Sequence, residues 1–375
     1  MIPIANAAKA AGHTVAVAGQ GLLAGQIEAA GFAPFATGPD DDPPQRLPLF
    51  DPHAKHEGRG MRNRFARRYA PHRASDLLPI CLDWEPDLMV CGEVDFGAMV
   101  IAEHLGLPHA AVIAFATGQR LRPDDVAEPL NELRAEYGLP ADPDMRMLNR
   151  YLRMSPFPPS FRHPEAPLSD GGHSFRYDPR PNEGTPPWAG QRPGAPTVYF
   201  TLGTVFNTES GDLFSRVLSG LGELPVNVLV TVGNNIDPAE FGPQPDNIHV
   251  ARYVPQGQVL PHCDLVVSHA GSGSVLGAIA HGLPSVYIPI GADQPQNAAR
   301  CVQLGLGRIL DAITVTPPEI RDAVAAELAD PAHRNATRRL RAEFAAQPSP
   351  EEMVPLLEKL VAETPAAPRL ALPLG

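Results

Sequence analysis

Small residues and a histidine gather in one short segment, Ser268-His269-Ala270-Gly271-Ser272-Gly273-Ser274. An apolar run predicts a strand over 264–268 just before it, and a helix is predicted from about residue 273. Glycine and serine let backbone amides approach a ligand closely, and the first turn of a helix adds partial positive charge. The pattern favours phosphate or diphosphate binding, with His269 at the strand end. A tight turn with a buried histidine would explain the same residues without a ligand.

Dinucleotide binding is an alternative for this segment. Its glycines, Gly271, Gly273 and Gly277, lie one residue off the dinucleotide spacing, and Asp293 is the acid that such a site would use. That fingerprint normally follows the first strand of its domain, whereas several predicted strands precede this segment. We therefore favour the diphosphate interpretation.

A second polar segment follows the predicted strand 285–289. Asp293 and Gln294 stand side by side there and offer the acceptors and the amide that vicinal sugar hydroxyls need. Helix capping alone would also explain an aspartate at position 293. The segment is therefore a candidate sugar site.

Two further strand ends carry weaker signals. Tyr253 ends the predicted strand 248–253, and Val254 and Gln256 follow it. An aromatic ring close before a proline offers a flat platform for a nucleobase there. A core tyrosine explains that position equally well when it is taken alone. Thr204 follows the strand 197–201 and offers a hydroxyl to a phosphate oxygen. Ligands of open parallel sheets bind beyond the carboxyl ends of strands, where all four segments lie.

Together the segments Y-V-P-Q, H-A-G-S-G-S and P-I-G-A-D-Q-P-Q-N-A resemble the donor signature of GT-B glycosyltransferases in the UDP-glycosyltransferase-like family, and the bacterial natural-product (macrolide-type) glycosyltransferases within it. The resemblance implies that Tyr253 stacks on the base and that Gln256 and the Val254 backbone meet base or ribose. It places the diphosphate on His269 and the amides after it, and the donor sugar on Asp293 and Gln294. The expected donor-binding residues are Thr204, Tyr253, Val254, Gln256, His269, Gly271, Ser272, Gly273, Ser274, Asp293 and Gln294.

The alternation of predicted strands and helices indicates an α/β protein. The resemblance implies the GT-B fold, with two Rossmann-like doubly wound parallel-sheet domains facing across a cleft. We expect an acceptor-binding domain over 1–154, a proline-rich linker over 155–196 and a donor-binding domain over 197–349. A C-terminal helix and tail, 350–375, is expected to pack back toward the N-terminal domain.

The catalytic base that the resemblance implies has no matching residue in this chain. In the resembled family it is a histidine in a G-H-x-x-P loop after the first strand, and residues 3–15 match the helix that follows that loop. The first strand and the histidine would then precede Met1, while His13 matches a structural position. A start assigned too late, a truncated protein without activity, and another base are the explanations left open. Glu93 and Asp95, after the strand 87–91, are the candidates for the last, although Asp95 also suits a helix cap.

The resemblance implies an inverting, metal-independent transferase that moves a sugar from a nucleotide to a hydroxyl of a lipophilic acceptor. UDP-sugar relatives often carry a glutamate where this chain has Gly277, which favours a dTDP-deoxysugar over a UDP-sugar. No further cofactor and no metal are expected. A non-catalytic nucleotide-sugar-binding protein and a nucleotide-sugar 2-epimerase are the alternatives.

Composition narrows the partners. The net charge of -12 argues against nucleic acid and anionic membranes. Four cysteines without a C-x-x-C pair, and no signal peptide, favour a reduced, cytoplasmic setting. Residues 265–292 contain no Asp, Glu, Lys or Arg. Glycine, proline and serine nevertheless interrupt this segment too often for a membrane span. Acceptor identity and oligomeric state leave no signal in the sequence.

Overall fold

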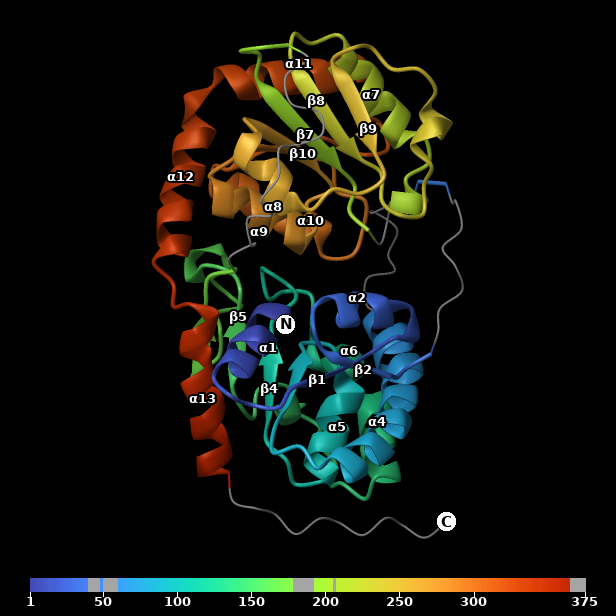
Figure 1. Cartoon of the computed structure of the whole chain (residues 1–375), viewed down its shortest axis with the longest axis vertical. Helices are drawn as coiled ribbons and strands as arrows, with labels where there is room; N and C mark the ends of the chain where they lie inside the picture. Colours follow the sequence, from blue (N-terminus) through green and yellow to red (C-terminus); the bar gives the residue numbers. More distant parts are fainter. Residues whose placement is uncertain (40–47, 50–59, 178–191, 205–206, 365–375) are drawn as a thin grey trace. The chain divides into compact units, whose positions relative to one another are not determined.

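The computed structural model describes residues 1–39, 48–49, 60–177, 192–204 and 207–364. The chain divides into two compact units, shown in Figure 1. Unit 1 comprises Met1–Asp42, Lys55–Tyr177 and Gln347–Gly375, and unit 2 comprises Pro43–Ala54 and Asp178–Ala346.

Unit 2 is built on a six-stranded parallel sheet in the order β12-β11-β10-β7-β8-β9. Its strands are β7 (Thr197–Thr201), β8 (Asn227–Thr231), β9 (Ile248–Ala251), β10 (Leu265–Ser268), β11 (Ser285–Tyr287) and β12 (Gly307–Ile309). The strand order reverses at β7, which pairs with β8 on one side and with β10 on the other. Such a reversal leaves a crevice at the carboxyl ends of the strands, where ligands of doubly wound sheets bind.

Helices cover both faces of this sheet because alternate strand residues point to opposite sides. Val198 and Phe200 of β7 pack in one core cluster with α7 (Leu213–Gly222) and α11 (Pro317–Ala329). Tyr199 packs in another with α8 (Gln256–Val259) and α9 (Ser272–His281). The remaining helices are α10 (Gln294–Gln303), beside β12, and α12 (Pro331–Ala345), beside α9.

Unit 1 holds two parallel sheets among its described residues. One pairs β1 (Ala16–Gly19) with β2 (Ala33–Ala36), and the other has the order β3-β4-β5-β6. The second sheet contains β3 (Met89–Gly92), β4 (His109–Val112), β5 (Arg153–Ser155) and β6 (Gly172–Ser174). The helices are α1 (Ile2–Ala10), α2 (Ala24–Ala29), α4 (Ala70–Trp84), α5 (Phe96–His104), α6 (Pro123–Glu136) and α13 (Pro350–Glu363), with a π-helix over Gly60–Tyr69 before α4.

The second sheet is also covered on both faces. Ala111 of β4 packs in a core with residues of α4, α5 and α6, whereas Ala110 and Val112 pack with α1 and α13. Helix α13 is in contact with α1, and the Nε2 atom of His13 lies 3.0 Å from a carboxylate oxygen of Glu358. The C-terminal helix therefore belongs to the core of unit 1.

The strands predicted over 197–201, 264–268 and 285–289 are confirmed as β7, β10 and β11, and β7 has the predicted bounds. Between α6 and β5, only Arg146–Leu148 forms a helical turn. The linker predicted over 155–196 is wrong in its first part: residues 155–177 belong to unit 1 and include β6. Residues 178–191 of that prediction and residues 365–375 of the tail lie outside the described residues.

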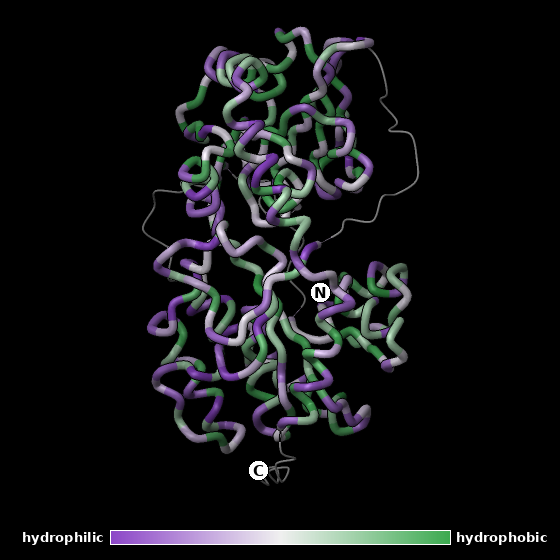
Figure 2. Tube along the Cα trace, turned by 90° about the vertical axis from the view of Figure 1, so that its left-hand side faces the viewer, coloured by the Kyte–Doolittle hydropathy of each residue, from purple (hydrophilic) through white to green (hydrophobic). Residues whose placement is uncertain are grey.

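No helix in the described part of the chain is long and apolar enough to cross a membrane. Figure 2 shows hydrophobic and hydrophilic stretches alternating along the tube in both units.

Candidate functional site

The structure places the predicted donor residues at the carboxyl ends of four strands of unit 2. Thr204 follows β7, Tyr253 to Gln256 follow β9, His269 to Ser274 follow β10, and Asp293 and Gln294 follow β11. Strands β7, β10 and β11 are neighbours in the sheet, so three of the four loops are adjacent. The fourth loop approaches through α8, whose Gln256 lies against Gly277 of α9.

His269 fills the space between two of these loops. A Cβ atom at Gly203 would lie 2.6 Å from the imidazole Nε2, and a Cβ at Gly271 would lie 2.3 Å from the same atom. Real side chains never approach so closely, so only glycine fits on either side of the ring. Gly203 also has a φ of +76°, which glycine adopts without strain. The glycines after β7 and β10 thus share one reason, the seating of this histidine.

The imidazole of His269 is neutral at pH 7. Its side chain is buried, and burial lowers the pKa of His269 from 6.5 to about 4, because a charged ring cannot be solvated there. A neutral imidazole still donates one hydrogen bond. The ring also has a backbone hydrogen-bond partner in Thr201, which takes the one N–H of the neutral form and leaves the other ring nitrogen as an acceptor.

The first turn of α9 offers the positive end of a helix. The backbone N–H groups of Gly273 and Ser274 lie in the first turn, where no carbonyl of the helix reaches them. Gly273 is exposed, and a Cβ placed there would meet nothing within 4 Å. The N-terminus of the ten-residue α9 is thus open to a ligand beside its second residue.

The Asp293 side chain is tied to the α9 loop and to the side chain of Asn297, and not to the backbone of α10. Its side chain makes no capping hydrogen bond to α10. Instead its Oδ2 atom accepts a hydrogen bond from the Ser272 hydroxyl at 2.6 Å and one from the Asn297 amide at 2.7 Å. The capping alternative for Asp293 is therefore wrong. Its second oxygen has no hydrogen bond among the described residues.

Asn297 connects the two loops, and the sequence-based list missed it. Its buried amide also donates to the Ala270 carbonyl at 3.0 Å and to the Ser272 hydroxyl at 3.2 Å. The one signal in the sequence was that an asparagine four residues after Asp293 has no capping role. Its role depends on the approach of two loops that are distant in sequence.

Backbone strain marks the same two loops. Ala270 has a φ of +62° and Ala292 a φ of +56°, a region that alanine rarely occupies. Gln294 supports the second loop, because its buried Oε1 atom accepts hydrogen bonds from the N–H groups of Ile290 (2.7 Å) and Gly291 (3.0 Å). Only the amide nitrogen of Gln294 is left to contact a ligand.

The loop after β9 has an exposed aromatic ring. Tyr253 is 58% exposed, so the alternative of a core tyrosine is wrong, whereas Val254 is buried. A Cβ at Gly277 would lie 2.8 Å from Oε1 of Gln256 and 2.8 Å from Leu260, so glycine lets α8 pack against α9. The Gln256 side chain occupies the space that a larger residue at position 277 would need.

The two candidate bases of unit 1 are held in ion pairs. Glu93 is buried, and its oxygens accept hydrogen bonds from the N–H groups of Ala114 (3.0 Å) and Phe115 (2.9 Å) and from Arg153 (2.8 Å). Asp95 caps α5 through the Ala98 N–H at 3.4 Å and pairs with Arg73 at 2.9 Å. Both carboxylates thus have structural partners. Among the described residues, no three His, Cys, Asp or Glu side chains gather where they could hold a metal ion.

Comparison with known proteins gives the site a family. Residues 215–360 match the family model described as Erythromycin biosynthesis protein CIII-like, C-terminal domain. The chain is 29% identical to tylactone mycaminosyltransferase of Streptomyces fradiae over 96% of this chain and 89% of that protein. It is 30% identical to aclacinomycin-T 2-deoxy-L-fucose transferase of Streptomyces galilaeus over 77% of this chain and 69% of that protein.

The fold agrees with these relatives. The solved structure of spinosyn forosaminyltransferase superimposes with a TM-score of 0.77 and 26% identity, covering 96% of this chain and 95% of that one. The parallel sheets of this chain's two units agree with that fold. The chain therefore belongs to the GT-B glycosyltransferases of antibiotic biosynthesis.

Proposed function

We propose that the protein transfers a deoxysugar from a dTDP-linked donor to a hydroxyl group of a lipophilic natural product, with inversion and without a metal ion. The observation that carries the proposal is the pair of linked loops after β10 and β11. They set His269, the open first turn of α9 and the Asp293 carboxylate beside one another. This arrangement combines a place for a diphosphate with a carboxylate for a sugar.

The donor would lie along the carboxyl edge of the unit 2 sheet. The diphosphate would accept hydrogen bonds from the amides of Gly273 and Ser274, beside His269, and the helix dipole would favour its charge. The unoccupied Asp293 oxygen and the Gln294 amide would hold the donor sugar. Tyr253 would stack on the base, since its ring is exposed in the loop after the edge strand β9.

The transfer itself would be a single displacement. The acceptor oxygen bonds to the anomeric carbon while the bond from that carbon to the diphosphate oxygen breaks, and the diphosphate leaves with the electron pair. Fixed dipoles at the leaving group lower the barrier without a metal ion. The acceptor hydroxyl must give its proton to a base. We assign this role to neither Glu93 nor Asp95, because both are held by arginines.

The preference for dTDP over UDP rests on Gly277 and Gln256. With Gln256 packed over Gly277, no acidic side chain projects from that position of α9 toward a ribose. A deoxyribose has one hydroxyl group fewer than a ribose. It therefore loses fewer hydrogen bonds, and less binding free energy, at a site without an acidic side chain. The relative named as a 2-deoxy-L-fucose transferase supports a deoxysugar as the group transferred.

Calorimetric titration of the full chain with dTDP and with UDP tests the donor. We expect dTDP to bind at least about tenfold more tightly, which corresponds to about 1.4 kcal/mol. Tighter binding of UDP would overturn the assignment of the base. Binding of neither nucleotide would overturn the donor site itself.

A further inference from the structure

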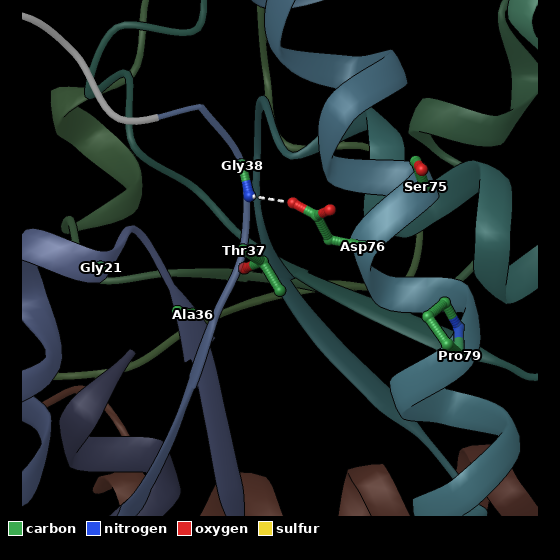
Figure 3. A pocket seen from close by; sticks show the side chains of 7 residues that line it. All are labelled: Gly21, Ala36, Thr37, Gly38, Ser75, Asp76 and Pro79. Carbon is green, nitrogen blue, oxygen red and sulfur yellow. Dashed lines mark hydrogen bonds between the residues drawn. The ribbon is translucent and has the colours of Figure 1, made fainter.

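A polar pocket of about 310 Å³ lies within unit 1, apart from the donor loops. Figure 3 shows its lining, which comprises Gly21, Ala36, Thr37, Gly38, Ser75, Asp76 and Pro79. Gly21 follows β1, residues 36–38 end β2 and follow it, and the last three residues belong to α4. The pocket therefore lies at the carboxyl ends of two parallel strands, the usual place for ligands in such sheets. Its volume suits a ring-sized organic group.

The polar groups of the pocket are mainly hydrogen-bond acceptors. The Asp76 carboxylate projects from α4 toward Gly38, as Figure 3 shows, and its Oδ2 atom accepts the Gly38 N–H at 2.7 Å. The other Asp76 oxygen has no hydrogen bond among the described residues. Gly38 has a φ of +80°, so the turn that aims its N–H at Asp76 suits glycine.

Pro79 changes the hydrogen bonding of a carbonyl group in α4. It lies inside α4, where it has no N–H to donate to the carbonyl four residues earlier. That carbonyl belongs to Ser75, which also lines the pocket. A proline in a helix interior is costly, and here it withholds the usual helical hydrogen bond from the Ser75 carbonyl. The exposed Ser75 hydroxyl makes no hydrogen bond within the described part of the chain.

Among the described residues, no basic side chain lines the pocket. The nearest arginine on the same helix, Arg73, pairs with Asp95 and donates to the Thr37 hydroxyl and to the Ala18 carbonyl (3.0 Å). The Arg73 guanidinium is thus already paired with groups of the protein. An anionic ligand would meet the Asp76 carboxylate without compensation, whereas a ligand that donates hydrogen bonds would satisfy it.

We propose that this pocket binds a hydroxylated ring of the acceptor molecule, whose hydroxyl groups donate to Asp76 and to the Ser75 carbonyl. The assignment to the acceptor rests on the proposed function. It adds that the acceptor is not uniformly lipophilic but carries a neutral ring rich in hydroxyl groups, which this pocket separates from the carbon skeleton.

Ligand-observed NMR on the full chain tests the pocket directly, with methyl α-D-glucopyranoside and its uronate analogue as probes. We expect saturation transfer to the neutral glucoside and little to the uronate. Asp76→Asn should weaken glucoside binding about tenfold, because it removes one charge-assisted hydrogen bond. Asp83→Asn, an exposed change at the end of the same helix and outside the pocket, is the matched control and should bind as the wild type does.

A second variant separates binding from folding. Pro79→Ala restores the N–H that reaches the Ser75 carbonyl, so it should raise the melting temperature and weaken glucoside binding. All three variants should bind dTDP as the wild type does, because the donor loops belong to unit 2. Equal glucoside binding by Asp76→Asn and Asp83→Asn, or uronate binding as tight as that of the glucoside, would overturn the proposal. A wild-type protein that does not bind dTDP would instead count against the proposed function.

Discussion

At the scale of single residues, Asp293 shows how one carboxylate serves two purposes. One oxygen holds the α9 loop through the Ser272 hydroxyl, and the other has no partner among the described residues. A residue that only capped its helix would instead bond to the backbone of α10.

Asp293→Asn keeps one carbonyl oxygen for Ser272 and Asn297 but removes the charge and the second acceptor. We expect affinity for dTDP-glucose to fall about 10- to 100-fold, the worth of a hydrogen bond to a charged group. Affinity for dTDP should change little, because dTDP has no sugar. Calorimetry with both ligands measures the difference, and Asp246→Asn, an exposed change in unit 2, is the control. An equal loss for both ligands would show that Asp293 does not contact the sugar.

Glu93 makes the opposite case, a suggestive carboxylate with a structural role. Glu93→Gln breaks a buried pair with Arg153, which costs about 3 kcal/mol in the free energy of unfolding. Urea denaturation should show this loss, whereas the exposed change Glu28→Gln should show none. A Glu93→Gln protein of normal stability that binds dTDP and yet transfers no sugar would restore Glu93 as the base.

At the scale of elements, Asn297 joins the start of α10 to the loop before α9. It holds Ala270, Ser272 and Asp293 at once, and two of the three come from another loop. Alanines with positive φ in both loops suggest that these contacts maintain a strained arrangement. The loops should therefore lose their ligand geometry together.

Asn297→Ala should lower the free energy of unfolding by about 2 kcal/mol, because it leaves buried acceptors unsatisfied. It should also weaken dTDP binding, unlike Asp293→Asn. Asn297→Asp should bind dTDP-glucose even less well, since it places a second carboxylate against Asp293. Gln303→Ala, at the exposed end of α10, is the control for both measurements. Wild-type binding by Asn297→Asp would contradict the positioning role.

The elements also show what the sequence can and cannot predict. Long apolar runs gave β7, β8 and β10, and the residues that follow them gave the candidate donor loops. Strands β2, β6 and β12 were missed because each is short and lacks the continuous apolar run that marked β10 and β11. Helix α4 was missed because Pro71 and Pro79 interrupt its pattern. Contacts between loops, such as those of Asn297 and His269, depend on strand order, which the sequence does not display.

At the scale of the molecule, each unit contains a buried histidine that resists protonation. Burial lowers the pKa of His109 in unit 1 and of His269 in unit 2 from 6.5 to about 4. Between those values the unfolded chain binds protons that the folded chain does not. The contribution of these two histidines to the free energy of unfolding is therefore fully present above about pH 6.5. It is lost as the pH falls toward 4.

Each histidine contributes up to about 3 kcal/mol to this loss. We expect a lower urea midpoint at pH 5 than at pH 7, measured by circular dichroism. His109→Gln should reduce the difference between the two midpoints, because it removes the titrating group from unit 1. An unchanged midpoint between pH 7 and pH 5 would show that neither ring is kept neutral by burial.

The central claim is that the four strand-end loops of unit 2 form the donor site. Amide hydrogen exchange of the full chain, with and without saturating dTDP, tests it most directly. The account predicts slower exchange at residues 253–256, 269–274 and 290–294, with β1 to β6 unchanged. Protection confined to unit 1, or no protection in these loops while dTDP is bound, would contradict it.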